Sequence, residues 1–378
     1  MPWQEQSVMT LRQEVVELAG REDANVRELC RRYEISAKTG YKWLDRWAAA
    51  GAAGLADRSR RPLRSPARTA AALEERVVAV RRAHPTWGGR KIHHCLQQQG
   101  VGDVPAPSTI TAILRRHDLL AAAADTPHPW QRFEHAAPND LWQLDFLGHR
   151  PVEDGQRVHP LTILDDHSRF LLALVACSCE QQEVVQAHLT ACFRRYGLPR
   201  AILTDNGPPW GTSGGGGLTA LEAWLLRLGI SPRHGRAYHP QTQGKVERMH
   251  GTIAADVFAH RSLPDLAACQ PAFDAFRQVY NHDRPHEALA YAVPASRYAA
   301  SSRAFPEPLP PIAYGPDDQV RLVRDQGAIS FRGRSWFVSR GLIGLPVAVR
   351  PTTTDDLFQV VFCRREVATL DLAAPDAV

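Results

Sequence analysis

The sequence lacks any apolar run of about 20 residues, the length that a helix needs to cross a membrane. Its first residues, MPWQEQSVMT, also lack the apolar core of a secretory signal. These two absences argue against membrane insertion and against secretion. We therefore expect a cytoplasmic protein that has no membrane partner.

Cysteine is scarce and scattered, with seven residues in a chain of 378 and no CxxC pair. The odd number and the spacing argue against a disulfide framework and favour reduced thiols. His93, His94 and Cys95 are adjacent, but no second pair of ligands follows at zinc-finger spacing. The sequence therefore predicts neither disulfides nor a structural zinc site.

Positive charge is unevenly distributed along the chain. The net charge is +5, yet residues 1–137 contain 21 Lys and Arg against 15 Asp and Glu, and the remainder is close to neutral. An excess of arginine at one end indicates a polyanionic partner, usually a nucleic acid. A solvated basic surface without a partner is the alternative.

Residues 1–56 have the pattern of three short helices. Apolar residues recur at helical spacing over residues 11–19 and 26–33, and Ser36 can cap a third helix. We expect this third helix to turn Tyr41, Leu44 and Trp47 inward. The last two helices, joined by a tight turn, predict a helix-turn-helix DNA-binding domain. The third helix would then present four DNA-contacting side chains, Lys38, Thr39, Lys42 and Arg46.

Residues 57–69 form a basic linker, because DRSRRPLRSPAR holds five arginines and two prolines that disfavour a helix. Such an arm can lie along a DNA minor groove, with Arg58, Arg60 and Arg61 as candidate contacts. A plain solubilising linker is the alternative. Residues 70–123 then carry a second, weaker helix-turn-helix-like pattern.

From about residue 138 the pattern changes to strands. The runs LWQLDFLG, HPLTILDDHS and RFLLALVACS indicate a three-stranded meander, and strands then alternate with helices to about residue 298. This order predicts a mixed α/β core. Residues 317–378 form only strand-like runs, with Gly327 and Gly333 at hairpin turns, and predict a small C-terminal β-barrel.

Three acidic residues occupy unusual places in the core. Asp145 lies in the middle of the first strand, Asp205 follows a buried strand in TDNG, and Glu247 lies on the helix expected to begin at Pro240. Carboxylates that converge from two strands and a helix suit Mg²⁺ or Mn²⁺. The alternative is that Asp205 caps a turn and Glu247 is a solvated helix residue.

The segments LWQLDF, LTDNG, YHPQTQGKVER and YNHDRPHEAL together resemble the retroviral-integrase-like DDE transposases of bacterial insertion sequences. The resemblance implies a ribonuclease-H-like (integrase) catalytic core over residues 138–298, with a five-stranded sheet. It implies a catalytic and metal-binding triad, Asp145, Asp205 and Glu247, that holds two Mg²⁺ or Mn²⁺ ions. It also implies cleavage at the ends of a mobile element and joining of the freed 3′-hydroxyl to target DNA, by a homo-oligomer associated with the nucleoid.

Two features depart from the simplest pattern of that family. Forty-one residues separate Asp205 from Glu247, and the excess falls in a glycine-rich stretch, GTSGGGG. An insertion in such a loop should leave the triad in place. The zinc-binding domain of retroviral integrases is absent, and helix-turn-helix units stand there instead, which favours a transposase that finds its own ends.

Several neighbours of the acids are further candidates. Lys245 is the best candidate for a DNA phosphate contact near the site, and Arg248 is a second one. We expect a turn role for Asp165 and Asp166, rather than metal binding. Arg284 is expected to pack at the end of the core, with a DNA contact as an alternative, and Trp142 and Trp210 are expected in the core.

Two other functions use the same sequence features. A metal-dependent nuclease would need the same triad but would not join DNA strands. A DNA-binding regulator derived from a transposase would need the helix-turn-helix units, but it would have no use for three converging acids.

Overall fold

The computed structural model describes residues 7–58, 68–120, 134–211, 217–235, 244–259 and 262–374. The chain divides into two compact units, Met1–Arg68 and Thr69–Val378, and each is described by itself. Among the described helices, none is long and apolar enough to cross a membrane. The seven cysteines are all free thiols.

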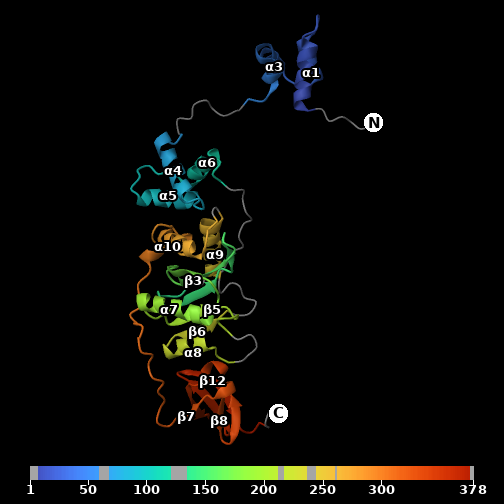
Figure 1. The fold of residues 1–378 in the computed structure, drawn as a ribbon. Helices are drawn as coiled ribbons and strands as arrows, with labels where there is room; N and C mark the ends of the chain where they lie inside the picture. Colours follow the sequence, from blue (N-terminus) through green and yellow to red (C-terminus); the bar gives the residue numbers. More distant parts are fainter. Residues whose placement is uncertain are drawn as a thin grey trace. The chain divides into compact units, whose positions relative to one another are not determined.

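The first unit is a bundle of three helices, α1 (Val8–Ala19), α2 (Val26–Arg32) and α3 (Ala37–Ala50), followed by the short turn η1 (Gly51–Leu55) (Figure 1). Ser36 caps α3 as expected, because its side chain accepts a hydrogen bond from the backbone of Thr39. A Cβ atom on Gly40 would overlap the sulfur of Cys30 on α2. Glycine at this position therefore lets the last two helices approach closely, as the helix-turn-helix layout requires.

The expectation that Tyr41 faces inward is wrong. Tyr41 is 47% exposed, whereas Trp43 is 5% exposed and packs with Val16 and Leu55. Three cations lie over the Trp43 ring, Arg12, Lys42 and Arg46. The sequence pattern misassigned the inner face because three apolar or aromatic residues lie within four positions, and only packing against α1 decides which of them is buried.

The second unit begins with another three helices, α4 (Ala71–Ala83), α5 (Gly89–Gln98) and α6 (Pro107–Arg116), around a small apolar core. Glu74 on α4 is buried in this core. Its two carboxylate oxygens meet Arg116 at 2.8 Å and His117 at 3.0 Å, so the buried charge is paired. These helices match the predicted second helical region.

A sheet of six strands follows, β1 (Trp142–Phe146), β2 (Arg150–Pro151), β3 (Arg157–Asp165), β4 (Leu171–Cys177), β5 (Ala201–Thr204) and β6 (Ser231–His234). The meander is confirmed, because β3 pairs antiparallel with both β1 and β4. Strand β5 then runs parallel to β1, and β6 parallel to β5. The sequence did not predict β6, since SPRH is short and polar.

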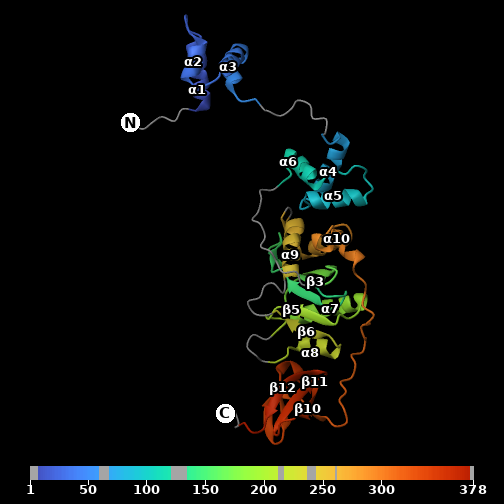
Figure 2. The same ribbon diagram turned by 180° about the vertical axis from the view of Figure 1, so that it is seen from behind.

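Helices cover both faces of this sheet (Figures 1 and 2). On one face α7 (Gln182–Tyr196) and α8 (Ala220–Arg227) pack on an apolar cluster that includes Trp142. On the other face lie α9 (Gly244–Ile253), its π-helical extension η3 (Ala254–Phe258), and α10 (Leu266–His282). The expected start of α9 at Pro240 lies outside the described residues.

After two short turns, η4 (Glu287–Leu289) and η5 (Pro294–Ser296), the chain ends in a β domain. The domain contains β7 (Gln319–Leu322), η6 (Asp325–Gly327), β8 (Ala328–Phe331), β9 (Arg334–Phe337), η7 (Arg340–Leu342), β10 (Pro346–Pro351), β11 (Leu357–Phe362) and β12 (Arg365–Asp371).

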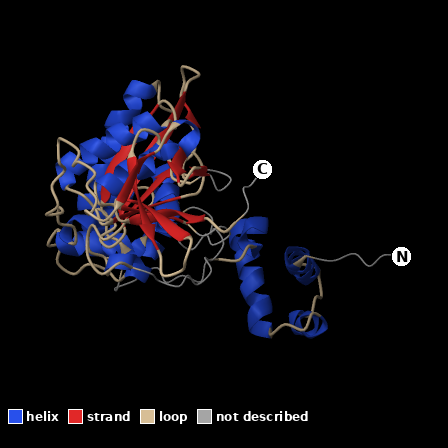
Figure 3. Ribbon diagram, turned by 90° about the horizontal axis from the view of Figure 1, so that it is seen from below, coloured by secondary structure: helices blue, strands red, loops and turns tan. Residues whose placement is uncertain are grey.

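Its strands form a four-stranded and a two-stranded antiparallel sheet around one core, which Leu218 and Ala223 also join. Gly333 turns the β8–β9 hairpin with φ +78°, as expected. The strands of core and β domain are red in Figure 3. The predicted class, with helical N-terminal units, a mixed α/β core and a C-terminal β domain, is confirmed.

We predict that Trp43→Ala opens the first helical unit, because truncating a buried tryptophan costs about 3–5 kcal/mol. Hydrogen exchange of the α3 amides in the full chain should then accelerate more than a hundredfold. Tyr41→Ala is the matched control on the exposed face and should leave exchange within a few fold. Equal protection in the two variants would contradict the assignment of Trp43 to the core.

Candidate active site

Asp145 lies on β1 in the interior of the sheet, where it pairs in register with Thr162 of β3. The hydroxyl of Thr162 donates to the main-chain carbonyl of Asp145 at 2.9 Å. The carboxyl side chain is half-buried. The main chain of this acid is therefore fixed on the strand, and only its carboxyl group is turned toward polar surroundings.

Asp205 directly follows β5 and stands at the carboxyl end of that strand. Its carboxylate accepts a hydrogen bond from the N–H of Gly207 at 3.3 Å, so it does cap the turn at Asn206. The side chain is nevertheless exposed. The turn role and a ligand role are compatible, because a capped carboxylate keeps further acceptor sites.

Helix α9 brings Glu247 and His250 to the same region. Glu247 is exposed, whereas His250, one turn further on, is mostly buried. The Nδ1 atom of His250 lies 3.9 Å from a carboxylate oxygen of Asp145, and its Nε2 atom lies 2.9 Å from the hydroxyl of Thr162. His250 therefore docks α9 against the two strands beside Asp145.

The charges of the acids act on one another. Burial raises the pKa of Asp145 to about 7, and the negative charges of Asp205, Glu247 and Glu180 raise it as well, against a hydrogen bond from Phe146. Burial also raises the pKa of Asp205. Burial lowers the pKa of His250 to about 4, so this ring is neutral at pH 7. A bound divalent cation would relieve this excess of negative charge.

The three acids do not form a complete metal-coordination site in the described part of this structure. Within the described residues, no group of three His, Cys, Asp or Glu side chains lies close enough to hold one metal ion. Asp205 and Glu247 act on Asp145 through their charges rather than through direct contact. The sequence between β6 and α9, residues 236–243, lies outside the described part.

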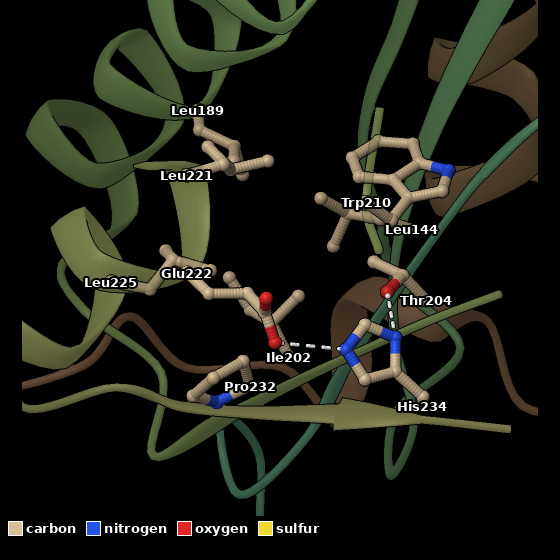
Figure 4. Close-up of a pocket in the computed structure, with 10 residues that line it drawn as sticks. All are labelled: Leu144, Leu189, Ile202, Thr204, Trp210, Leu221, Glu222, Leu225, Pro232 and His234. Atoms are coloured by element: carbon tan, nitrogen blue, oxygen red, sulfur yellow. Dashed lines mark hydrogen bonds and ion pairs between the residues drawn. The ribbon is translucent and has the colours of Figure 1, made fainter. Parts of the chain in front are cut away.

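A histidine, His234, and a buried glutamate, Glu222, are hydrogen-bonded to each other next to Thr204, the residue before Asp205 (Figure 4). His234, at the end of β6, is 2.8 Å from the main-chain carbonyl oxygen of Asp205 through Nδ1 and 2.9 Å from Glu222 through Nε2. The hydrogen bond to Glu222 raises the pKa of His234. Burial favours a higher pKa for Glu222, but the hydrogen bonds from His234 and Thr219 outweigh it and lower the pKa.

The adjacent acids Asp165 and Asp166 have structural roles. Both are fully buried. Asp165 accepts from the N–H groups of Asn139 and Ser168 and from the Ser168 hydroxyl. Asp166 accepts from Gln143 and from the N–H of His135. The expected turn role holds for Asp165, and it rests on these hydrogen bonds.

Lys245 is bound to one of these two buried acids, because its ammonium donates to the carboxylate of Asp166 at 2.5 Å. Its side chain is only 17% exposed. A phosphate contact by Lys245 stays a prediction, and in this structure the ammonium already has an anionic partner. Arg248, three residues on, is exposed.

The other predicted DNA contacts differ in exposure. Lys38, Lys42 and Arg58 are exposed, whereas Thr39 and Arg46 are partly covered. The Thr39 hydroxyl is 2.8 Å from that of the capping residue Ser36, and Arg46 lies over the Trp43 ring. Arg60 and Arg61 lie outside the described residues.

Three further residues are placed in the interior. Trp142 and Trp210 are buried in the core, as expected. Arg284 is also buried, and it donates to Asp256 at 2.9 Å and to Thr86 at 3.2 Å. These contacts support the packing role of Arg284 rather than a DNA contact.

Sequence reasoning missed His250, His234 and Glu222. His250 could have been found, because residues three apart on a helix lie on one face and His250 follows Glu247 by three positions. His234 and Glu222 gave no such signal. His234 and Glu222 are 12 residues apart in the sequence. They meet because β6 pairs with β5 and α8 packs against these strands.

Family models match successive parts of the chain. A "Helix-turn-helix domain" matches residues 11–62 and a "Homeodomain-like domain" residues 39–114. Two models, both described as "Integrase core domain", match residues 135–240 and 228–294. The "IS481 family transposase, C-terminal domain" matches residues 318–377. These regions together contain every residue of the candidate site.

Proteins of insertion elements are similar to this chain. The 31.7 kDa protein of insertion element IS407 of Burkholderia multivorans is 30% identical over 168 residues, 44% of this chain, and the chain spans 58% of that relative's length. The 39.2 kDa protein of insertion element IS476 of Xanthomonas euvesicatoria is 25% identical over 66% of this chain and 71% of its own length.

A viral polyprotein and a solved structure are also similar. The Gag-Pro-Pol polyprotein of Mason-Pfizer monkey virus is 34% identical over 38% of this chain and 8% of its own length. A solved chain in the simian T-cell lymphotropic virus intasome with PP2A regulatory subunit B56 gamma is 17% identical, with a TM-score of 0.38, and covers 77% of this chain and 99% of its own.

Proposed function

We propose that this chain, which matches helix-turn-helix, integrase core and IS481-family transposase C-terminal domain models, is a DDE transposase. It would bind the ends of a mobile DNA element, cleave them with the help of divalent metal, and join the 3′-hydroxyl ends to target DNA. The observation that carries the proposal is Asp145, a half-buried acid on a core strand. Burial raises its pKa to about 7, and the charges of Asp205 and Glu247 add to this shift.

The donor set fits Mg²⁺ or Mn²⁺, because carboxylate oxygens are the ligands these cations prefer. Asp145, Asp205 and Glu247 would hold them. When bound, such ions would supply Lewis-acid activation of an attacking oxygen and stabilisation of a leaving one in phosphodiester chemistry. No other resident group is needed for this proposal.

Residues around the acids have supporting tasks in this scheme. Asp145, whose carboxyl has a pKa of about 7, gives up its proton before it binds a cation. The neutral His250 holds α9, and with it Glu247, against Thr162 of β3. The Lys245–Asp166 pair joins the start of α9 to the end of β3. Both contacts fix the helix that carries the third acid.

The helical N-terminal region would find the DNA. The exposed side chains of Lys38 and Lys42 lie on α3, the second helix of the helix-turn-helix, which is the element that enters the major groove in such motifs. A site that joins two element ends needs two active centres at once, and we therefore expect a homo-oligomer in the DNA complex. We expect the protein to act on DNA in the bacterial cytoplasm.

We predict that Asp145→Asn, Asp205→Asn and Glu247→Gln each abolish end cleavage and strand joining, since each removes one metal-binding charge. Binding of the element ends should change by less than about threefold, because these residues lie outside the helix-turn-helix units. Gel shifts and joining assays on one oligonucleotide substrate measure both. Full joining by any of the three would refute the triad, and cleavage without joining by the unaltered chain would identify a nuclease.

We also predict that Lys38→Ala with Lys42→Ala weakens end binding and lowers the slope of log affinity against log salt by about two. The charge-matched control is Arg194→Ala with Arg195→Ala, two exposed cations on α7. The control should retain the preference for element ends over unrelated DNA. If the two double variants behave alike, α3 is not the recognition helix.

A further inference from the structure

We propose that Glu222 and His234 form a positioning pair that holds the main chain of Asp205 in place for metal binding. The inference rests on the proposed function, because it gives the pair a task in the metal site. Neither residue is offered as a ligand. His234 contacts the carbonyl oxygen of Asp205 and the hydroxyl of Thr204. Glu222 contacts His234 and the N-cap residue Thr219.

The imidazole ring of His234 lies between two acceptors. Nδ1 is 2.8 Å from the carbonyl oxygen of Asp205 and 3.3 Å from the hydroxyl of Thr204. Nε2 is 2.9 Å from a carboxylate oxygen of Glu222, and Figure 4 shows the contacts of the ring with Thr204 and Glu222. Neither the carbonyl nor the ionised carboxylate can donate a hydrogen bond. Both contacts are satisfied when the ring donates from both nitrogens.

Glu222 is itself fixed before it meets the histidine. Its side chain is 7% exposed, and its second carboxylate oxygen accepts from the backbone N–H of Thr219 at 2.7 Å. The Thr219 hydroxyl accepts in return from the N–H of Glu222, which makes a capping box at the start of α8. The carboxylate therefore presents one oxygen to His234 from a rigid helix end.

The ends of β5 and β6 are tied together on both sides of Asp205. The N–H of Gly235 donates to the carbonyl of Thr204 at 3.0 Å, and the side-chain amide of Asn206 donates to the carbonyl of Gly235 at 2.9 Å. Between these two ties, the carbonyl oxygen of Asp205 is contacted by His234 at 2.8 Å and by the hydroxyl of Thr204 at 3.2 Å. Asp205 is thus the middle of a short segment whose neighbours on either side are anchored to the same strand.

The C-terminal β domain holds the other side of α8. The hydroxyl of Ser339 is buried and donates to the carbonyl of Leu218 at 2.8 Å, next to the cap of the helix. A Cβ atom on Gly341 would overlap that same carbonyl, so the two segments are in close contact. The contacts run without a break from the β domain through α8 and Glu222 to His234 and Asp205.

A partner that fixes the orientation of a ligand commonly changes metal affinity about 10–100-fold when it is removed. A pair that only stabilises the fold behaves differently, since buried ion pairs are often replaced by neutral groups at little cost. Metal affinity in a folded variant therefore separates the two roles, and it does not depend on catalytic activity.

The test compares Mn²⁺ affinity, measured by electron paramagnetic resonance of the free ion, in two variants of the full chain. Glu222→Gln removes the buried charge but keeps an acceptor for Thr219 and a donor for the ring, so Nδ1–H can remain on Asp205. We expect affinity within about threefold of the unaltered chain. Adding His234→Phe keeps an aromatic ring but removes the donor, and affinity should fall at least about tenfold.

Two further variants act as controls. Adding His234→Gln to Glu222→Gln restores an N–H that can reach the carbonyl, and it should recover most of the affinity. Glu74→Gln removes a buried carboxylate in the α4–α6 unit and should leave Mn²⁺ affinity unchanged. Equal affinity of Glu222→Gln with and without His234→Phe overturns the proposal. If His234→Phe prevents folding, His234→Leu replaces it. A loss of affinity in that variant then supports the proposal, and unchanged affinity overturns it.

Asp205→Asn separates failure of this inference from failure of the proposed function. Weaker Mn²⁺ binding by Asp205→Asn, with no effect of the His234 change, contradicts only the positioning pair. An unaltered chain that binds no Mn²⁺, or Asp205→Asn with undiminished affinity, contradicts the metal site and therefore both proposals.

Discussion

Burial of a carboxyl group near other carboxylates is the constraint that the candidate site imposes on the core. Asp145 lies half-buried on a strand, and burial raises its pKa to about 7, with a further contribution from the negative charges of Asp205, Glu247 and Glu180. Carboxylates that lie close together in a partly buried site tend to separate or to take up protons. The fold fixes the backbone that carries each acid, and under the proposed function a bound cation would relieve the repulsion.

The core fixes each acid with a different device. Asp145 is held by the sheet and by the hydroxyl of Thr162. Asp205 is held by the ties between β5 and β6, with His234 behind its carbonyl. Helix α9 is docked by His250 and by the pair of Lys245 with Asp166, yet Glu247 itself remains exposed. The carboxyl group of Glu247 is therefore the least constrained of the three.

Features that follow from hydrophobic periodicity and from sequence motifs were predicted from the sequence. Features that depend on tertiary packing were not. Local sequence patterns predict the meander, the helix caps and the position of Asp145 on a buried strand. Two features depend on neighbours far along the chain. Trp43, and not the expected Tyr41, is buried in the core of the first unit. The ammonium of Lys245 is paired with Asp166. Strand β6 was not predicted because SPRH is only four residues long and contains one apolar residue, Pro232. Without β6, the contact of His234 with Asp205 could not be predicted.

The most direct test of the account is a strand-transfer assay with the full chain and the DNA that flanks its own gene, run without metal, with Mg²⁺ and with Mn²⁺. The assay asks for the product itself, a covalent joint between an element 3′-end and target DNA. The account predicts joined product with either cation and none without. Joined product that forms equally well in the absence of divalent metal would contradict it.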